Sequence, residues 1–509
     1  MKIDRELRNL SDEELEILMQ TGASSLPPDD NLVAEITPWR KAINRALVGF
    51  ALNMVTLNFL GLAYLLPAIG SLLLLLGFRA LRQENKGFRL CWYLSILQLV
   101  FRYSTLILNA TVWQAEIYQL PVMEAAAYFL PVLTFVQLLG LRAGFRSTRR
   151  RNNLAPAAPG TTALIVWYVV LYILAVSSYT GWLLSIPLVI AYIVILRTLW
   201  KLPRQLEEAG YALQPVPVRL SDRALSFTVC IALTIGIAAG YLLFNRYKMD
   251  WREVSPAEQA GLEELRAELL ELGFPEVVLD DLSAEDLAAC EGAVRVVTDQ
   301  RDCHVNDGRQ VVQRDGNHTT YSRVYDVNEL RITGVAVELS GERECWRIFH
   351  HFEWVIDPGF YGTEAMQFWP AYHLAEGWSK GGEATGRVLY DLDGQTYTSP
   401  YYSLGEQTFQ QNSIFFENQQ RTDLFAAFSF PAHGERQRGY VTYDTLECAD
   451  GWIIDSWINY VHQCSWFQYP VQTAMENRMH GSWNISGPFR LVQDALQFYP
   501  FDDPIEVIN

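Results

Sequence analysis

The first apolar stretch of the chain, Ala46–Phe78, contains 33 residues without a charged side chain. A helix of that length would be about 50 Å long, whereas the hydrocarbon core of a bilayer is about 30 Å thick. Asn58, Gly61 and Pro67 interrupt the helical pattern near its middle. The stretch is therefore predicted to enter the membrane and return, either as two spans broken around residues 59–66 or as one re-entrant hairpin.

Five more apolar runs follow before residue 250, and their lengths of about 14 to 21 residues are close to what a membrane-spanning helix needs. They are Leu90–Asn109, Pro121–Leu141, Thr162–Tyr179, Trp182–Ile195 and Leu225–Phe244. With the first stretch they predict an α-helical polytopic membrane domain of about seven segments over residues 38–245.

Lys and Arg residues between these runs indicate the orientation of the chain. Seventeen lie on one set of connections: from Arg40 to Arg45, from Arg79 to Arg89, from Arg142 to Arg151 and from Arg197 to Arg223. The alternate connections, at 59–66, 111–120 and 180–181, contain none. Basic loops stay in the cytoplasm, so the N-terminus is predicted inside the plasma membrane and the C-terminal half outside. Arg246, Lys248 and Arg252 are the exception to this pattern. Residues 1–37 lack the pattern of a cleavable signal peptide and are predicted to be a cytoplasmic segment.

The external half begins with helical patterns over residues 251–294. Ser255 and Glu258 form a capping box, and Ser283 starts a second short helix. Leucines at 262, 265, 269 and 272 recur at helical spacing between them. These residues predict a short helical collar between the membrane and the rest of the external half, packed against the latter; a partner-binding amphipathic helix is the alternative.

Residues 295–509 change to a period of two. Asp-Gly pairs, which suit two-residue hairpin turns, separate runs rich in Val, Thr, Tyr and Phe. Another hairpin is expected at Ser340-Gly341, and eight or more short antiparallel strands favour a β-sandwich or a jelly roll. The chain is thus predicted to be a helical membrane domain plus a mainly-β extracytoplasmic domain.

Charge divides the chain at the same boundary. Residues 1–250 carry 23 Lys and Arg against 16 Asp and Glu, whereas residues 251–509 carry 17 against 41. Phosphate binding needs clustered Lys and Arg, so an external half this acidic argues against nucleic acid as a partner. The lipid bilayer is the partner that the apolar runs predict, and an envelope glycan or a protein is the kind of ligand left for the external domain.

The sequence His350-His351-Phe352-Glu353 resembles a metal site, but neighbouring residues on a strand point to opposite faces. His350 is therefore expected in the core among aromatic side chains. Arg347, His351 and Glu353 are expected to form a solvated polar row on the other face. No metal or other cofactor is predicted from this motif.

Other catalytic signatures are missing from the sequence: there is no Gly-x-Ser-x-Gly, His-Glu-x-x-His, phosphate-binding loop or Cys-x-x-Cys. An aromatic cluster between Trp452 and Trp483 is typical of a sandwich core, with sugar stacking as the alternative. Five external cysteines permit at most two disulfides, and buried thiols are the alternative. They are Cys290, Cys303, Cys345, Cys448 and Cys464.

Ionisable residues inside a membrane carry a functional expectation. Arg102 lies within the third segment, and Glu124 lies near the outer end of the next, antiparallel one. They are predicted to form an intramembrane ion pair, with Glu116 as the second choice of partner. A strut between two helices is one interpretation, and a polar path for transport is the other.

The stretch "ITPWRKAINRALVGFALNMVTLNFLGLAYLLPAIGSLLLLLGFRALRQENKGFR", residues 36–89, resembles the N-terminal region of uncharacterised multi-pass membrane proteins of Gram-positive anaerobic bacteria. The helices at 272–294 extend the resemblance. It implies a bacterial plasma membrane, and no activity or functional residue comes with it.

Taken together, these patterns favour a non-enzymatic protein whose external head binds or senses an envelope ligand, an extracellular ligand or a protein partner. A transport-associated membrane protein is the alternative, based on Arg102 and Glu124. A surface glycan hydrolase is a weaker alternative, because only acidic and aromatic content favours it.

Overall fold

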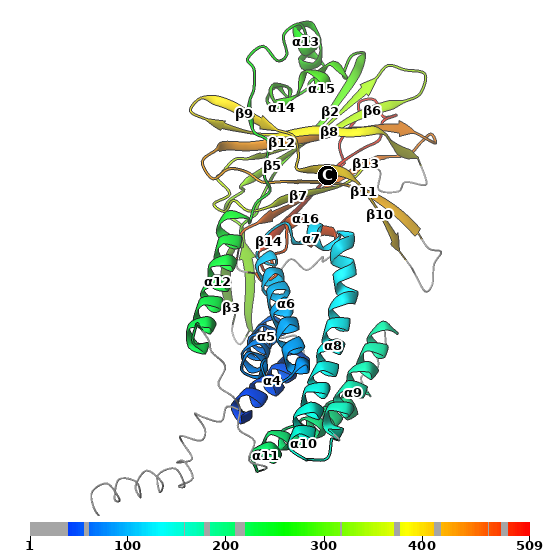
Figure 1. The fold of residues 1–509 in the computed structure, drawn as a ribbon. Helices are drawn as coiled ribbons and strands as arrows, with labels where there is room; N and C mark the ends of the chain where they lie inside the picture. Colours follow the sequence, from blue (N-terminus) through cyan, green and yellow to red (C-terminus); the bar gives the residue numbers. More distant parts are fainter. Residues whose placement is uncertain are drawn as a thin grey trace, which may run out of the picture. The chain divides into compact units, whose positions relative to one another are not determined.

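The computed structural model describes most of the chain and divides it into two compact units (Figure 1). The described residues are 39–54, 61–156, 158–177, 184–208, 219–315, 318–370, 377–411, 419–466, 468–479 and 487–508. The helical unit contains Met1–Ile107 and Glu116–Gly236, and the β unit contains Leu108–Ala115 and Ile237–Asn509. The predicted cytoplasmic segment, residues 1–37, lies outside the described residues.

Apolar helices dominate the first 250 residues, as their hydropathy predicts. They are α4 (Trp39–Met54), α5 (Leu62–Leu81), α6 (Lys86–Leu108), α7 (Gln114–Tyr118), α8 (Pro121–Arg151), α9 (Pro159–Val176), α10 (Ser185–Leu199), α11 (Lys201–Glu208) and α12 (Asp222–Leu243). Within the described ranges, six are long and apolar enough to cross a membrane: α5, α6, α8, α9, α10 with its extension to Pro203, and α12. Five of the six correspond to the apolar runs after the first stretch.

The first apolar stretch folds as two helices, α4 and α5, that pack antiparallel. Gly49 of α4 faces Gly70 of α5, and Gly77 of α5 faces Ala42 and Ala46 of α4. A Cβ atom at Gly77 would lie 2.7 Å from the Ala42 carbonyl oxygen, so the two backbones are in contact. The second helix begins at Leu62, inside the stretch predicted as the break, and Pro67 lies within it as its sixth residue. A proline there removes one backbone hydrogen bond of the helix.

The basic ends of these helices gather at one end of the helical unit. Asp222, at the start of α12, accepts from Arg45 of α4 at 2.6 Å and from Arg79 of α5 at 3.3 Å. At the same end of α5, Asn85 donates to Thr148 of α8, and Arg149 of α8 donates to the Gln205 side chain of α11. The first halves of α4 and α12 and the C-terminal ends of α5 and α8 therefore lie at the same end of the unit.

The C-terminal part is mostly β, with every strand pairing antiparallel. One sheet has seven strands in the order β1-β9-β8-β12-β6-β5-β2, a second has five in the order β10-β11-β7-β13-β14, and β3 pairs with β4. The strands are β1 (Arg252–Glu253), β2 (Ala293–Cys303), β3 (Arg309–Asp315), β4 (His318–Val324), β5 (Leu330–Leu339), β6 (Cys345–Trp354), β7 (Glu364–Trp369), β8 (Trp378–Leu392), β9 (Gln395–Ser399), β10 (Ser403–Gln411), β11 (Gln419–Phe428), β12 (Glu435–Glu447), β13 (Ile454–Gln463) and β14 (Phe489–Phe498).

Turn residues fix the register of two hairpins. Asp393 and Gly394 join β8 to β9 with φ angles of 51° and 78°, the left-handed values that a two-residue turn of this type requires. The hairpin expected at Ser340-Gly341 joins β5 to β6, with Leu339 opposite Cys345. All seven cysteines are free thiols, and Cys290 and Cys303 are buried, which favours the buried-thiol alternative.

The main core of the β unit draws side chains from both large sheets. Ile348 and Phe352 of the seven-stranded sheet, for example, share a buried cluster with Phe368, Phe428 and Tyr460 of the five-stranded one. These aromatic side chains belong to strands with period-two patterning, so the alternation in the sequence places one face of each strand inside.

Three short helices, α13 (Glu263–Glu271), α14 (Glu276–Asp281) and α15 (Ala284–Ala288), cover the opposite face of the seven-stranded sheet (Figure 1). Leu269 and Val278 pack there against Val335 and Phe349. The predicted packing of this segment on the β strands is confirmed. The helix expected to start at Ser283 is α15, and the Ser283 hydroxyl accepts from the Asp286 amide. The helix expected to start at Ser255 begins instead at Glu263, after a series of turns.

The helical segment does not lie between the C-terminal end of α12 and the strands, as the predicted collar requires. Within the β unit, Tyr241 at the end of α12 and Tyr247 pack with Ala427 and Val471, on the five-stranded sheet. Helix α16 (Ala474–Met479) lies on that side too, whereas α13–α15 lie beyond the seven-stranded sheet (Figure 1). The sequence order suggested the collar, but residues 244–254 carry the chain past both sheets before the first short helix begins.

Candidate functional site

A cavity of about 260 Å³ lies within the helical unit, between α4, α5, α6, α8 and α9. We call it the Arg102 cavity, because Arg102 of α6 is the charged residue among those that line it. Seven polar residues line it as well: Asn53, Ser71, Gln98, Thr105, Thr134, Gln137 and Tyr168. A polar space of this size inside a bundle of apolar helices is the strongest sign of a ligand site in the described part of the chain.

Pairing between α6 and α8 positions the cavity. Gln98 of α6 donates to Thr134 of α8 at 3.3 Å, and Gln137 of α8 donates to Ser95 of α6 at 2.8 Å. These pairs define an antiparallel register in which Arg102 lies level with Leu130 and Pro131. Side chains at helical spacing on the facing sides of two spans therefore build the wall of the cavity.

Arg102 and Glu124 are not brought together. In the register of α6 and α8, Glu124 lies opposite Leu108, six residues beyond Arg102, which is about 9 Å along the helix axis. Glu124 is exposed, and among the described residues no hydrogen bond or ion pair links these two side chains. Arg102 lines the cavity instead.

Most hydroxyl groups around the cavity bond to the backbone of their own or a neighbouring helix. Thr105 donates to the Arg102 carbonyl at 2.7 Å, Ser71 to the Pro67 carbonyl at 2.8 Å, and Tyr168 to the Pro131 carbonyl at 3.0 Å. In the described structure the Arg102 guanidinium makes no hydrogen bond to another residue. Its five N–H donors are therefore available to a ligand.

The site chemistry follows from the charge of Arg102. An arginine inside a membrane costs a few kcal/mol on insertion scales unless an opposite charge or water compensates it. Among the described residues that line the Arg102 cavity there is no Asp or Glu. An anion in the cavity would supply the missing charge and bond to the planar guanidinium, which matches carboxylate oxygens in pairs.

The predicted polar strand face exists, but it is not solvated. His351 of β6 is 1% exposed, because α14 covers it, and its Nε2 donates to Asp281 at 2.9 Å. Arg347 forms two hydrogen bonds with Asp444 of the adjacent β12, at 2.7 and 3.1 Å. The alternation of side chains predicts which face a residue takes, but not which element packs on that face.

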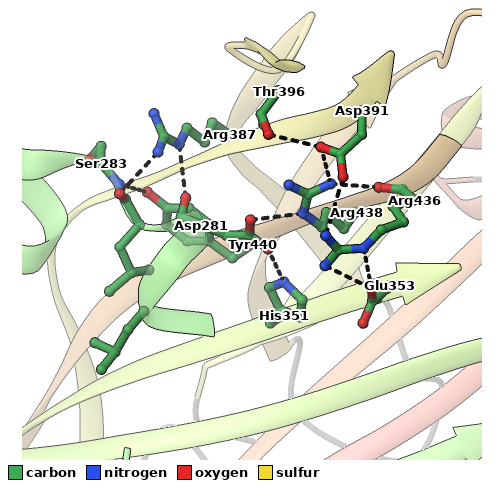
Figure 2. Close-up of polar contacts among 12 residues, drawn as sticks. Asp281, Ser283, His351, Glu353, Arg387, Asp391, Thr396, Arg436, Arg438 and Tyr440 are labelled. Atoms are coloured by element: carbon green, nitrogen blue, oxygen red, sulfur yellow. Dashed lines mark hydrogen bonds and ion pairs between the residues drawn. The ribbon is translucent and has the colours of Figure 1, made fainter. Parts of the chain in front are cut away.

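Asp281 is the centre of a buried polar network beneath α14 (Figure 2). Its second carboxylate oxygen accepts from Arg438 Nε at 2.8 Å, and Arg438 also donates to Asp391 at 3.0 Å. Arg387 donates to the Asp281 carbonyl at 2.9 Å, and Glu353 lies near the exposed Arg436 at 3.4 Å (Figure 2). The groups of this network satisfy one another, so we assign it to holding α14 on the sheet.

His350 lies on the opposite face, as predicted. It packs beside Phe368 and Tyr443, and its Nε2 lies 2.8 Å from the Ser456 hydroxyl oxygen. Burial lowers the pKa of His350 to about 3, so the ring is neutral. Because His350 and His351 face opposite sides of the sheet, the two rings do not converge on one point.

A cleft of about 670 Å³ in the β unit lies beside Asp307, Glu329, Asp357 and Arg490. Each of these charged groups already bonds to the protein: Asp307 pairs with Arg490 at 2.5 Å, Glu329 accepts from the Val305 amide, and Asp357 accepts from Tyr361. The four charged groups of this cleft therefore already have partners within the protein.

Comparison with known proteins adds no family. No family model matches the chain, and no curated protein matches it.

Proposed function

We propose that the chain is a transport-associated plasma-membrane protein whose helical unit binds a small anionic solute in the Arg102 cavity. The single observation that carries this proposal is the arginine itself. It lines a polar cavity whose other lining residues include no acid, and its predicted partner Glu124 is on the exposed surface. The head-binding function expected first from the sequence has less support, because the charged groups of the cleft beside Asp307 and Arg490 already bond to the protein.

The proposal includes a topology of seven segments, with α4 completing the six longer helices. The N-terminus is cytoplasmic and the β unit is an extracytoplasmic sandwich, in a bacterial plasma membrane. Support comes from the basic helix ends that gather at one end of the helical unit. The buried cluster shared by the two large sheets supports the sandwich. In this proposal the β unit has no catalytic role.

Labelling of single cysteines tests the topology. Cysteine in place of Ser340, in the exposed turn between β5 and β6, should react with an impermeant thiol reagent on intact cells that express a variant without native cysteines. Cysteine in place of Ser147, at the basic end of α8, should react only after the cells are permeabilised. The reverse pattern would place the β unit in the cytoplasm and reject the proposed orientation.

Ligand-induced stabilisation tests the site. Purified full-length protein in detergent should unfold at a higher temperature in the presence of at least one small anion from a panel of acetate, butyrate, bicarbonate, sulfate and phosphate, because a ligand stabilises the state that binds it. The effect should disappear in Arg102→Gln. It should persist in the matched control Arg142→Gln, since Arg142 is exposed near the basic end of α8.

Uptake by proteoliposomes then distinguishes transport from binding alone. The anion that stabilises the protein should enter vesicles that contain the wild-type chain or Arg142→Gln, and not those that contain Arg102→Gln. Equal stabilisation of wild type and Arg102→Gln by every anion of the panel, or none in either, would reject the Arg102 cavity as an anion site.

A further inference from the structure

A second feature of the Arg102 cavity is the Gln137 amide of α8. Gln137 is 0% exposed, and its Oε1 has no hydrogen-bond partner in the described structure. Buried acceptors without a partner are rare, because each one costs about 1–3 kcal/mol of desolvation. Since Gln137 also lines the Arg102 cavity, the space beside it is where a partner can be supplied.

Neighbouring groups fix the orientation of this amide. Gln137 Nε2 donates to Ser95 Oγ at 2.8 Å and to the Cys91 carbonyl oxygen at 3.3 Å. Ser95 uses its own proton toward the same Cys91 carbonyl, at 2.8 Å. A flipped amide would place Oε1 against that carbonyl, which offers no proton. The acceptor Oε1 is therefore the atom of Gln137 that remains for a ligand.

The cavity thus presents two different groups to a ligand: a cationic donor at Arg102 and a neutral acceptor at Gln137. Gln137 lies level with Ser95, so the two positions are seven residues, or about 10 Å, apart along the helix axis before their side chains extend. A water molecule occupies about 30 Å³ in the liquid, so a cavity of about 260 Å³ accommodates a molecule of several heavy atoms.

The charge of the site selects among such molecules. One arginine neutralises one negative charge, which favours a monocarboxylate over a divalent phosphate. Because no acid lines the cavity, an ammonium group near Gln137 would be a second buried cation without a counter-charge. A hydroxyl group donates to Gln137 Oε1 without that cost.

We infer that the ligand of the Arg102 cavity is a short aliphatic monocarboxylate with a hydroxyl group at the far end from the carboxylate. Arg102 binds the carboxylate, and Gln137 Oε1 accepts from the hydroxyl. This inference depends on the proposed anion site, and it adds the ligand class and the residue that determines specificity.

A matched series of four-carbon acids provides the test in full-length protein in detergent, by calorimetric titration. 4-Hydroxybutyrate should bind about 10-fold or more tightly than butyrate, since a site with an unpaired buried polar group discriminates strongly for the missing partner. 4-Methoxybutyrate, which cannot donate, and 4-aminobutyrate, which brings a second cation, should bind no better than butyrate.

Two variants test the separate roles of Gln137 and Arg102 in binding. Gln137→Leu should abolish the difference between 4-hydroxybutyrate and butyrate while butyrate still binds, whereas Arg102→Gln should lose both. If Gln137→Leu does not fold, the comparison of hydroxyl and methoxy ligands in wild type still decides the point.

Equal binding of butyrate and 4-hydroxybutyrate would overturn the inference and indicate that water satisfies Gln137. Tighter binding of 4-aminobutyrate would overturn it in favour of a zwitterionic ligand. Binding of phosphate or sulfate without any carboxylate would also overturn the ligand class, yet leave the anion site standing. Failure of every anion would reject the site itself.

Discussion

Replacing Asp281 with alanine should reduce the free energy of opening of the β unit by about 3–5 kcal/mol, as expected when one partner of a buried ion pair is removed. Asp281 is 3% exposed and joins His351 of β6 to Arg438 of β12 (Figure 2). Without its carboxylate, both buried side chains lose a charged acceptor, and α14 loses its polar attachment to the sheet. Hydrogen–deuterium exchange of β6 and β12 in the full-length protein measures the change.

A matched control lies at the edge of the same network. Arg436 is 55% exposed and contacts Glu353 and Asp391 at 3.2–3.4 Å, so Arg436→Ala should change the free energy by about 1 kcal/mol or less. His351→Ala should resemble Asp281→Ala, because His351 is buried and hydrogen-bonded to it. If Asp281→Ala and His351→Ala both exchange like Arg436→Ala, α14 does not depend on this network.

The acidity of Asp281 sets the pH range of this prediction. Burial raises the pKa of Asp281, but the hydrogen bonds and charges of His351 and Arg438 outweigh it and hold that pKa below the ordinary 3.8. A carboxylate with a lowered pKa in the folded state contributes its stability above the unfolded pKa and loses it as the pH falls through the folded one. The loss in Asp281→Ala should therefore stay constant between about pH 5 and pH 8.

Several parts of the fold could be predicted because they depend on local patterns. Apolar length, proline and glycine breaks and the positions of Lys and Arg predict the helices from Leu90 to Phe244 and their alternating directions. The same is true of the turn at Asp393-Gly394 and of the opposite faces of His350 and His351. Each of these features needs only the residues of one element or one connection.

Features that depend on register between distant elements could not be predicted. Adjacent antiparallel spans suggested that Arg102 and Glu124 meet, but the bonds from Gln98 to Thr134 and from Gln137 to Ser95 set them about six residues apart. A different register would have changed the partner of Arg102 without changing its sequence neighbours.

The burial of His351 was missed for a related reason. Asp281 is 70 residues before His351, and nothing in the alternation of β6 indicates that α14 covers it. A signal for the network does exist in the sequence, because Asp280 and Asp281 follow an apolar turn of helix. That signal does not identify the partners of Asp281, because Arg387 and Arg438 lie on strands far along the chain.

Replacing Gly77 with leucine should separate α4 from α5 and reduce the yield of folded protein. A Cβ at Gly77 would lie 2.7 Å from the Ala42 carbonyl oxygen and 2.8 Å from the Ala46 nitrogen. Both are backbone atoms, so no side-chain rotation relieves the overlap. Small residues in membrane helices allow this kind of close approach. The cost should reach or exceed the roughly 1–3 kcal/mol typical of overpacking, because a whole helix must move.

Thermal unfolding and gel filtration of the full-length protein in detergent measure that loss. Ser104→Leu, which adds a leucine at an exposed position of α6, is the matched control and should behave as wild type. Gly77→Ala should fall between them, since it introduces the Cβ overlap without the larger side chain. Because α4 and α5 also supply Asn53 and Ser71 to the Arg102 cavity, anion binding should weaken in the same order. A Gly77→Leu protein with wild-type unfolding temperature and anion affinity would show that the two helices do not pack through this glycine.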